Sequence, residues 1–429
     1  MQQDKLHTIN KIYPWFAGLT NNLVFYVVIN TVWLTNVKGF DAMQVVFLEV
    51  CVGLAVRIFL TPALRLSERL GNTWAMRLGA IFLFITSLLL TFGTEYWVFM
   101  LAMLFQALAV VLMAMRDILI QDNLSHMHKS EDYLKISSRS HLIYTAATMI
   151  ASLLVGIFFA KWQYLPMVLG SVICGIAVVM SFFIYDIEDS KAISNPSNAT
   201  RSIKNTIDPN SIISTSQEGN HDKLSLPHPI KLSLTVLIFS GLLYGVINLA
   251  QNNGKLLLQY QLETQFSVDQ VVAYLGLAWF ISQVVRIIVD LIYPALQRRL
   301  QNKVVILLAL WGILSVALLL LGFFLPIDFA SRMLLMASGF ILSPAIRDPL
   351  HIFCQTTLFK KVDKADRKDA LVYLVVMQQA GQFLFSLVAS AILLFLPLQY
   401  TIVAVAIAAI PVFAIALRLS RILRRGVER

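Results

Sequence analysis

The chain has 429 residues, of which 58% are hydrophobic and only 14% are charged, and its mean hydropathy is +0.73. This composition excludes a soluble globular domain, which needs far more polar surface. The net charge of +10 does not indicate nucleic acid, because the basic residues form short clusters between apolar segments and have no nucleic-acid-binding motif around them. We therefore expect a polytopic membrane protein.

The apolar segments are each about long enough to cross a bilayer. Six lie at 14–35, 43–63, 75–93, 96–118, 140–160 and 163–185, and six more at 232–260, 268–294, 303–325, 329–350, 371–396 and 398–418. Residues 187–230 between these groups are rich in Ser, Asn, Asp and Pro and have too few apolar residues to form a packed core. The sequence thus predicts an N-terminal six-helix half (1–186), a flexible linker (187–230) and a C-terminal six-helix half (231–429).

The distribution of Lys and Arg predicts the orientation. With the N-terminus inside, Lys38, Lys161 and Arg332 fall outside, and Arg57, Lys255 and Arg286 fall within spans. All the others of the 34 basic residues lie on the inner side. Because cytoplasmic loops collect positive charge, we expect a multi-pass protein of the cell membrane with both termini and the linker in the cytoplasm.

The two halves repeat short patterns in the same order. Single matches of this kind are weak, but matches in order and at one spacing indicate a duplication. The matched pairs, at spacings of 226 to 232 residues, are Gln44 and Gln270, Arg57 and Arg286, Pro62 and Pro294, and Arg116 and Arg347. We therefore expect an all-α integral membrane protein with twelve transmembrane helices in two parallel six-helix repeats.

The second apolar segment is followed by the sequence Leu64-Arg65-Leu66-Ser67-Glu68-Arg69-Leu70-Gly71-Asn72. It is similar to the loop signature G-x-x-x-D-R-x-G-[RK]-[RK] of the major facilitator superfamily, with Glu68 at the acidic position, Arg69 at the basic one and Gly71 at the second glycine. The first glycine and the closing basic pair are replaced. Together with the repeated six-helix halves, the resemblance implies a secondary transporter that works by alternating access, of unidentified subfamily.

The same resemblance implies a cytoplasmic gate built from charges of the loop signature and of the inner helix ends. Arg116-Asp117 and Arg347-Asp348 lie at the predicted cytoplasmic ends of the fourth and tenth helices. We expect contacts among these charges, Glu68 with Arg116 first, to hold the inner side closed. The alternative is that they are ordinary charges at the membrane surface.

Ionisable residues within spans are candidates for substrate binding or coupling, since burying them in a membrane is costly. Arg57 and Arg286 hold equivalent places in the two halves, and Glu49 is a carboxylate suited to carrying a proton. The alternative is structural ion pairing. Arg286 has Asp290 one turn away, and Glu49 could neutralise Arg57 or Lys255.

The seventh segment contains a polar, glycine-containing stretch, Asn248-Leu249-Ala250-Gln251-Asn252-Asn253-Gly254-Lys255. Broken helices in membranes line hydrated cavities, so this stretch predicts a break and a binding site that includes Asn252 and Lys255. The alternative is that it is the outer end of a shorter helix, from which Lys255 reaches the lipid headgroups.

These observations predict a carrier of a small anionic or amphipathic solute, driven by a proton or substrate gradient. The alternative is a polytopic enzyme or flippase-like protein that handles lipid-linked substrates. Because no enzyme or metal motif is present, we expect no catalytic residue, metal or cofactor. The expected partners are the solute and membrane lipids, without nucleic acid, and the expected state is a monomer.

Overall fold

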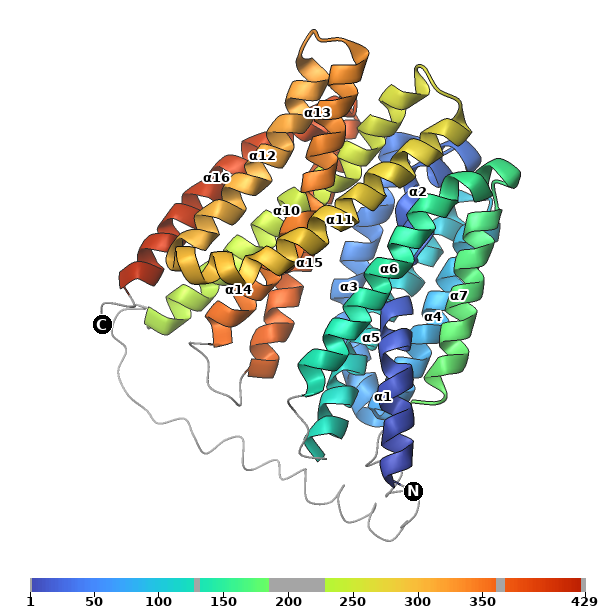
Figure 1. The fold of residues 1–429 in the computed structure, drawn as a ribbon, viewed down its shortest axis with the longest axis vertical. Coiled ribbons are helices and arrows are strands. Elements are labelled where there is room, and N and C mark those ends of the chain that lie inside the picture. The colour runs from blue at the N-terminus through green and yellow to red at the C-terminus, as the bar shows by residue number, and fades with distance from the viewer. Residues whose placement is uncertain (1, 127–131, 185–227, 360–366, 426–429) are drawn as a thin grey trace.

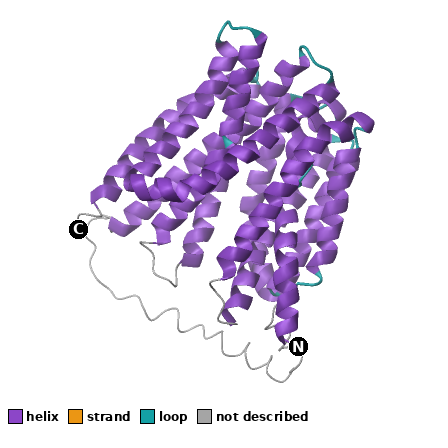
Figure 2. Cartoon of the chain, viewed as in Figure 1, coloured by secondary structure: helices purple, strands orange, loops and turns teal. Residues whose placement is uncertain are grey.

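The computed structural model describes residues 2–126, 132–184, 228–359 and 367–425, and every regular element within these ranges is a helix (Figure 2). Ten of the helices are long and apolar enough to cross a membrane, and the shorter apolar helices Tyr26–Val37 and Leu165–Ser181 complete the twelve predicted spans. The first half comprises α1 (Gln2–Leu19), α2 (Tyr26–Val32), η1 (Trp33–Val37), α3 (Ala42–Leu70), α4 (Asn72–Phe92), α5 (Tyr96–His126), α6 (Asp132–Lys161) and α7 (Leu165–Ser181). The second half comprises α10 (His228–Glu263), α11 (Val268–Leu300), η2 (Gln301–Lys303), α12 (Val304–Phe324), α13 (Phe329–Leu342), η3 (Pro344–Ile346), α14 (Arg347–Phe359), α15 (Arg367–Leu393) and α16 (Gln399–Arg425).

The helices form two bundles that lie side by side, with both chain ends on the same side of the molecule (Figure 1). We call this side the terminal side and the other the far side. The predicted linker lies outside the described residues except for 228–230, which are the first residues of α10. The outward faces expose large apolar side chains such as Leu142, Leu334 and Ile407, as expected for helices surrounded by lipid.

Local sequence fixes several helix boundaries. Gly71, the glycine of the loop signature, has φ 83° at the junction of α3 and α4, a conformation that side chains other than glycine rarely adopt. On the far side, α11 begins with a capping box between Ser267 and Gln270. Asp328 caps α13 by accepting a hydrogen bond from the backbone N–H of Ser331 at 3.0 Å.

The two halves pack against each other through α6 with α11 and through α3 with α15. The closest approaches use small residues. A Cβ atom added to Gly156 of α6 would lie 2.8 Å from Cβ of Ala273 in α11, and one added to Gly53 of α3 would lie 2.9 Å from Cβ of Phe383 in α15. Each of these residues lies nearer the far-side end of its helix, so these contacts hold the halves together on the far side.

The predicted break in the seventh segment is wrong, because α10 is one continuous helix through the polar stretch. The break lies instead in the first span, where α1 ends at Leu19, α2 begins at Tyr26, and η1 continues as a π-helix. A helix keeps its own backbone hydrogen bonds wherever its polar side chains have other partners. In α10 those partners come from neighbouring helices, as described below.

The predicted helix ends at Arg116-Asp117 and Arg347-Asp348 are also wrong. Helix α5 continues to His126, and the tenth span runs from Phe329 through η3 and α14 to Phe359. Apolar content falls before these helices end, and hydropathy alone therefore placed the boundaries too early. The Arg-Asp pair of the second half consequently lies near the middle of its span.

Candidate functional site

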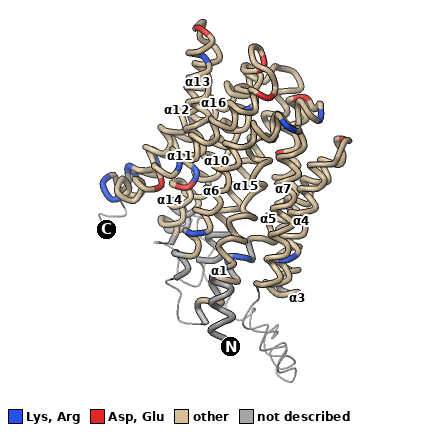
Figure 3. The backbone as a smooth tube through the Cα atoms, turned by 45° about the vertical axis from the view of Figure 1, so that its right-hand side comes forward, with Lys and Arg blue, Asp and Glu red and all other residues tan. Residues whose placement is uncertain are grey.

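Polar and charged side chains from both halves meet between the bundles. They come from α2, α3 and α6 in the first half and from α10, α11, α14 and α15 in the second. Figure 3 shows blue and red segments beside the labels of α11 and α14, at a distance from the charged segments at the helix ends. We call this set the interface cluster; its charged members are Glu49, Lys255, Arg286, Arg347 and Asp348.

Lys255 links α10 of the second half to α2 of the first. Its ammonium donates to the carbonyl oxygen of Val27 at 3.0 Å and to Oδ1 of Asn30 at 2.6 Å, and it lies 5.4 Å from the centre of the Trp279 ring. The residue is only 2% exposed. The alternative that Lys255 reaches the lipid headgroups is therefore excluded, and Lys255 is a buried cation of the interface cluster.

Glu49 of α3 is a carboxylate that the first half contributes to the cluster. Its Oε2 accepts a hydrogen bond from Nε2 of Gln382 in α15 at 3.1 Å, and Asn252 of α10 lies close to this side chain. The cations that act on it are Arg347 and Lys255, both from the other half. The sequence named Arg57 or Lys255 as its counter-charge, and the structure favours Lys255.

Arg347 lies at the start of α14, directly after the short 3₁₀ helix η3. Its Nη2 donates to Oδ1 of Asn248 at 2.7 Å and to Oε1 of Gln251 at 2.6 Å, and its guanidinium lies 5.5 Å from the centre of the Tyr244 ring. Its Nε is buried and has no hydrogen-bond partner among the described residues. Arg347 was predicted to be a gate residue, but these contacts place it in the interface cluster.

Arg116 makes corresponding contacts in the first half. Its Nη1 donates to the carbonyl oxygen of Ala17 and to Oγ1 of Thr20, both at 3.1 Å, and its own carbonyl oxygen accepts from the hydroxyl of Tyr13. Arg116 and Arg347 are 231 residues apart, and so are their partners at 17 and 248, at 20 and 251, and at 13 and 244. The duplication thus preserves an arginine on the fourth span that binds the first span of its half.

Sequence reasoning missed this part of the repeat. The pattern Tyr-x₇-Asn-Asn occurs twice, as Tyr13 with Asn21-Asn22 and as Tyr244 with Asn252-Asn253, again 231 residues apart. An alignment of the first and seventh segments at the spacing of the two arginines would have found it. Asn248 and Gln251 lie in the polar stretch that the sequence predicted as part of a binding site, but their bonds to Arg347 were not predicted. Trp279, the aromatic neighbour of Lys255, was missed.

Arg286 forms its ion pair with Asp348, through Nε and Oδ2 at 2.6 Å. The sequence paired Arg286 with Asp290, one turn along the same helix. Asp290 does lie close to both Arg286 and Asp348, but its Oδ1 is buried without a hydrogen-bond partner among the described residues. The local pairing prediction is therefore corrected, since a partner distant in sequence takes the guanidinium.

The other predicted site residues are spread more widely. Arg57 is exposed and makes no ion pair with any described acidic residue. It follows Glu49 and Gly53 at intervals of four residues, which places all three on one face of α3. The side chains of Glu68, Arg69 and Asp117 lie outside the described part of the structure, so the predicted gate contacts are untested.

A second polar contact between the halves lies on the far side of the cluster. Nε2 of Gln259 in α10 is 2.7 Å from Oγ1 of Thr35 and 2.9 Å from Oδ1 of Asn36, both in the π-helix η1, and 2.8 Å from Oε1 of Glu263. Gln259 and Lys255 are one turn apart on α10. Both therefore fasten α10 to the second part of the broken first span.

Several buried polar atoms in and around the cluster have no partner among the described residues. They are Oγ1 of Thr31, Nε1 of Trp279, Oε1 of Gln283 and Nε of Arg347. Buried donors and acceptors are normally satisfied, because leaving one unpaired costs roughly 1–3 kcal/mol. These atoms offer hydrogen-bond donors and acceptors to water or to a polar solute. No group of acidic, His and Cys side chains suited to a metal occurs in the described ranges.

Comparisons with known proteins agree with this architecture. A family model described as "Major Facilitator Superfamily" matches residues 15–346. No curated protein matches the chain by sequence.

The fold is similar to three kinds of solved transporter. The nucleoside transporter NupG has a TM-score of 0.70 and 16% identity, covering 97% of this chain and 98% of that one. The D-xylose-proton symporter has 0.67 and 12%, covering 96% and 97%. The peptide transporter POT in complex with sulfate has 0.65 and 13%, covering 97% and 95%. At these identities the likeness establishes the fold and leaves the substrate open.

Proposed function

The chain belongs to the major facilitator superfamily, and from this membership we propose that it is a secondary transporter that moves a small polar solute between its two halves by alternating access. The observation that carries the proposal is the interface cluster. Its buried charges come from both halves and find partners across the boundary between them, as Lys255 does with Asn30 and Glu49 does with Gln382. A purely structural interface in a membrane has little need of such groups, which are costly to bury.

In the proposed cycle the structure corresponds to a state closed on the far side. The close contacts of Gly156 and Gly53 with the other half and the bonds of Lys255 and Gln259 to the first span all lie on the far side or in the middle. Opening that side requires breaking these bonds. If the termini are cytoplasmic, as the Lys and Arg distribution predicts, this state faces inward.

Arg347 is the residue proposed to bind the substrate. Its Nε donor is buried and unpaired, and its present partners are neutral amides, so a carboxylate or phosphate would gain a charge-assisted hydrogen bond there. The sequence assigned an anionic group to Arg57, Arg286 and Lys255. Arg286 is occupied by its ion pair with Asp348, and Lys255 by its hydrogen bonds to Val27 and Asn30. This leaves Arg57 as a secondary candidate, on the same face of α3 as Glu49. We therefore propose a small organic anion or zwitterion.

Glu49 is the residue proposed to couple transport to protons. It accepts a hydrogen bond from Gln382 of α15 and lies close to Asn252 of α10, and both of these helices belong to the other half. Protonation would remove its attraction to Arg347 and Lys255 and so weaken the contact between halves. Among the similar structures, one is described as a proton symporter, which agrees with this drive but concerns another protein.

The test uses purified protein in liposomes, with labelled nucleosides, dipeptides, pentoses and monocarboxylates offered with and without a pH gradient. We expect uptake of a carboxylate-bearing compound, loss of binding in Arg347→Gln, and partial binding in Arg347→Lys, since lysine keeps the charge without the planar fork. Glu49→Gln should keep exchange of substrate across the membrane but lose accumulation driven by the pH gradient. Accumulation that persists in Glu49→Gln would exclude Glu49 as the proton carrier.

A further inference from the structure

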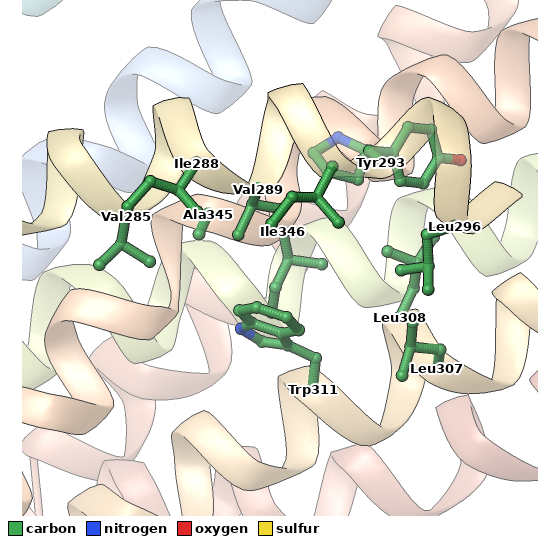
Figure 4. A pocket seen from close by; sticks show the side chains of 12 residues that line it. Val285, Ile288, Val289, Tyr293, Leu296, Leu307, Leu308, Trp311, Ala345 and Ile346 are labelled. Atoms are coloured by element: carbon green, nitrogen blue, oxygen red, sulfur yellow. The ribbon is translucent and has the colours of Figure 1, made fainter.

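An apolar groove lies on the outer face of the second half, away from the interface cluster. Its volume is about 260 Å³, and it is lined by α11, α12, η3 and the first turn of α14 (Figure 4). Ile288, Val289, Ile292 and Leu296 form one wall, and Leu307 and Trp311 form the opposite wall. The groove exists because α12 packs mainly against α13 and α16 and leaves a gap beside α11, which η3 closes from behind.

The dimensions and lining of the groove suit a hydrocarbon chain. From Val285 to Leu296 the wall follows α11 for 12 residues, which is 11 rises of 1.5 Å or roughly 16 Å. This length is comparable to the hydrocarbon of one leaflet, which is about half of a core of roughly 30 Å. The indole N–H of Trp311 donates to the carbonyl oxygen of Leu342, so this polar atom has its partner in the protein. Only apolar contact remains available to an occupant along most of the groove.

The terminal-side end of the groove carries positive charge. Arg299 follows Leu296 by three residues on α11 and so continues the helix face that lines the groove. Lys303, the last residue of η2, precedes Leu307 of α12 by four residues at the same end of the groove. Arg298 lies beside them, and all three are exposed. No Asp or Glu occurs in the sequence between Asp290 and Asp328 to neutralise them.

From this combination we infer that the groove between α11 and α12 binds an anionic phospholipid of the terminal-side leaflet, with one acyl chain in the groove and the headgroup phosphate at Arg299 and Lys303. Neither the hydrocarbon wall nor the basic rim alone identifies an occupant. Together they match a lipid that is apolar along its chain and negative at its head, at the depth where such a headgroup lies. The inference stands independently of the proposed substrate and coupling.

The groove and the interface cluster share the same helix turns. Val285 and Val289 line the groove on either side of Arg286, and Ile346 and Pro349 line it on either side of Arg347 and Asp348. A lipid in the groove would therefore pack against one side of these two helix segments, and the other side carries the Arg286–Asp348 ion pair. Bound lipid should stabilise this state of the protein, as any ligand that binds one state selectively does.

The test is native mass spectrometry of the full-length protein titrated with phosphatidylglycerol or with phosphatidylcholine of the same chains. We expect preferential retention of phosphatidylglycerol by the unmodified protein. Arg299→Gln with Lys303→Gln should weaken phosphatidylglycerol binding on the order of fivefold for each charge removed, while phosphatidylcholine binding stays unchanged. Ile288→Trp, at a half-exposed position of the groove wall, should weaken retention of both lipids by filling the groove.

The matched control is Lys11→Gln with Arg139→Gln, which removes two exposed charges from α1 and α6 of the other half, away from the groove. It should leave lipid retention unchanged. Equal weakening in this control would mean that the protein attracts anionic lipid by its general charge, and would overturn the site. Equal retention of both lipids by the unmodified protein, or full retention in Ile288→Trp, would overturn it as well. Thermal unfolding of each variant identifies any that fails to fold.

Discussion

In each half an arginine donates hydrogen bonds to the first span of that half, but the two halves provide different acceptors. In the first half, α1 ends at Leu19 and Arg116 donates to the backbone carbonyl of Ala17 and to the hydroxyl of Thr20. In the second half, α10 continues and Arg347 donates to the side-chain amides of Asn248 and Gln251. The arginines are equivalent by duplication, and their acceptors occupy equivalent positions.

The difference follows from where free acceptors are found. The last carbonyl groups of a helix have no partner within it, so an arginine beside a helix end can bind the backbone itself. A continuous helix uses its carbonyls internally, and an arginine beside it needs acceptors on side chains. Ala17 and Thr20 are therefore sufficient next to a break, whereas Asn248 and Gln251 are required next to an intact helix. The residue types at these two positions therefore indicate whether the neighbouring helix is broken, as at Ala17 and Thr20, or continuous, as at Asn248 and Gln251.

The largest expected effect comes from removing the arginine of the intact helix. Arg347→Met leaves the oxygens of Asn248 and Gln251 buried without their donor, which should lower the free energy of unfolding by about 3 kcal/mol, since an unpaired buried polar group costs roughly 1–3 kcal/mol. Unfolding by titration with a denaturing detergent in mixed micelles measures this. Arg298→Met, at an exposed arginine of α11, is the control and should change stability little. A similar loss in both variants would contradict the assignment.

A second variant gives the second half the residues of the first. Asn248→Ala with Gln251→Thr removes the acceptor at 248 and replaces the amide at 251 by a shorter hydroxyl, as at Thr20, while Arg347 stays. The guanidinium should then compete for carbonyls of α10 and open the helix near Asn252 to Gly254. We expect faster amide hydrogen exchange over residues 249–255 and a loss of roughly 2 kcal/mol. Thr20→Ala is the matched change in the first half. It should cost less, because the carbonyl of Ala17 remains available to Arg116. Unchanged exchange in α10 would show that its continuity does not depend on these amides.

A third variant, Gly254→Ala, tests whether α10 must bend at Gly254 during transport. A Cβ atom at position 254 would lie 2.9 Å from Cδ1 of Leu319, a side-chain tip that can move, and alanine favours a helix over glycine by about 1 kcal/mol. Gly254→Ala should thus keep or slightly raise stability. At Gly245 the added atom would meet the carbonyl oxygen of Gly381 at 2.7 Å, so Gly245→Ala should destabilise. A stable Gly254→Ala protein with normal transport would mean that α10 stays straight throughout the cycle.

The sequence predicted the architecture better than the site. Hydropathy and the repeats gave the twelve spans because both are properties of whole segments. The location of the break was not predictable from polarity alone, since Asn21-Asn22 and Asn252-Asn253 are the same dipeptide in a broken and in an intact span. Pairings such as Arg286 with Asp348 depend on how distant helices pack, and local spacing pointed to Asp290 instead. The charged residues of the cluster were found because charge is rare inside a membrane. Asn248, Gln251 and Asn252 were found with Lys255 as one polar stretch, whereas Trp279 gives no such signal in the sequence and was missed.

The smallest expected effect concerns the start of the tenth span, at the first turn of α13. The backbone N–H of Ser331 donates to Asp328 and holds the pKa of this exposed carboxyl below its ordinary value. A carboxyl with a lowered pKa in the folded protein contributes stability that is complete above its unfolded value, about pH 4, and is lost as the pH falls through the folded value. Acid should therefore loosen only the first turn of α13.

Amide hydrogen exchange at residues 329–332, corrected for the intrinsic effect of pH, measures this loosening. Protection should fall below about pH 4 in the unmodified protein. Asp328→Asn keeps an oxygen acceptor but cannot titrate, so its protection should be nearly independent of pH over the same range, whereas Asp328→Ala should lose protection at every pH. If the Asn variant loses protection in acid as the unmodified protein does, the pH dependence arises elsewhere. Asp328 would then stabilise the first turn of α13 only as a hydrogen-bond acceptor, and its negative charge would not contribute to the stability of the span that carries Arg347.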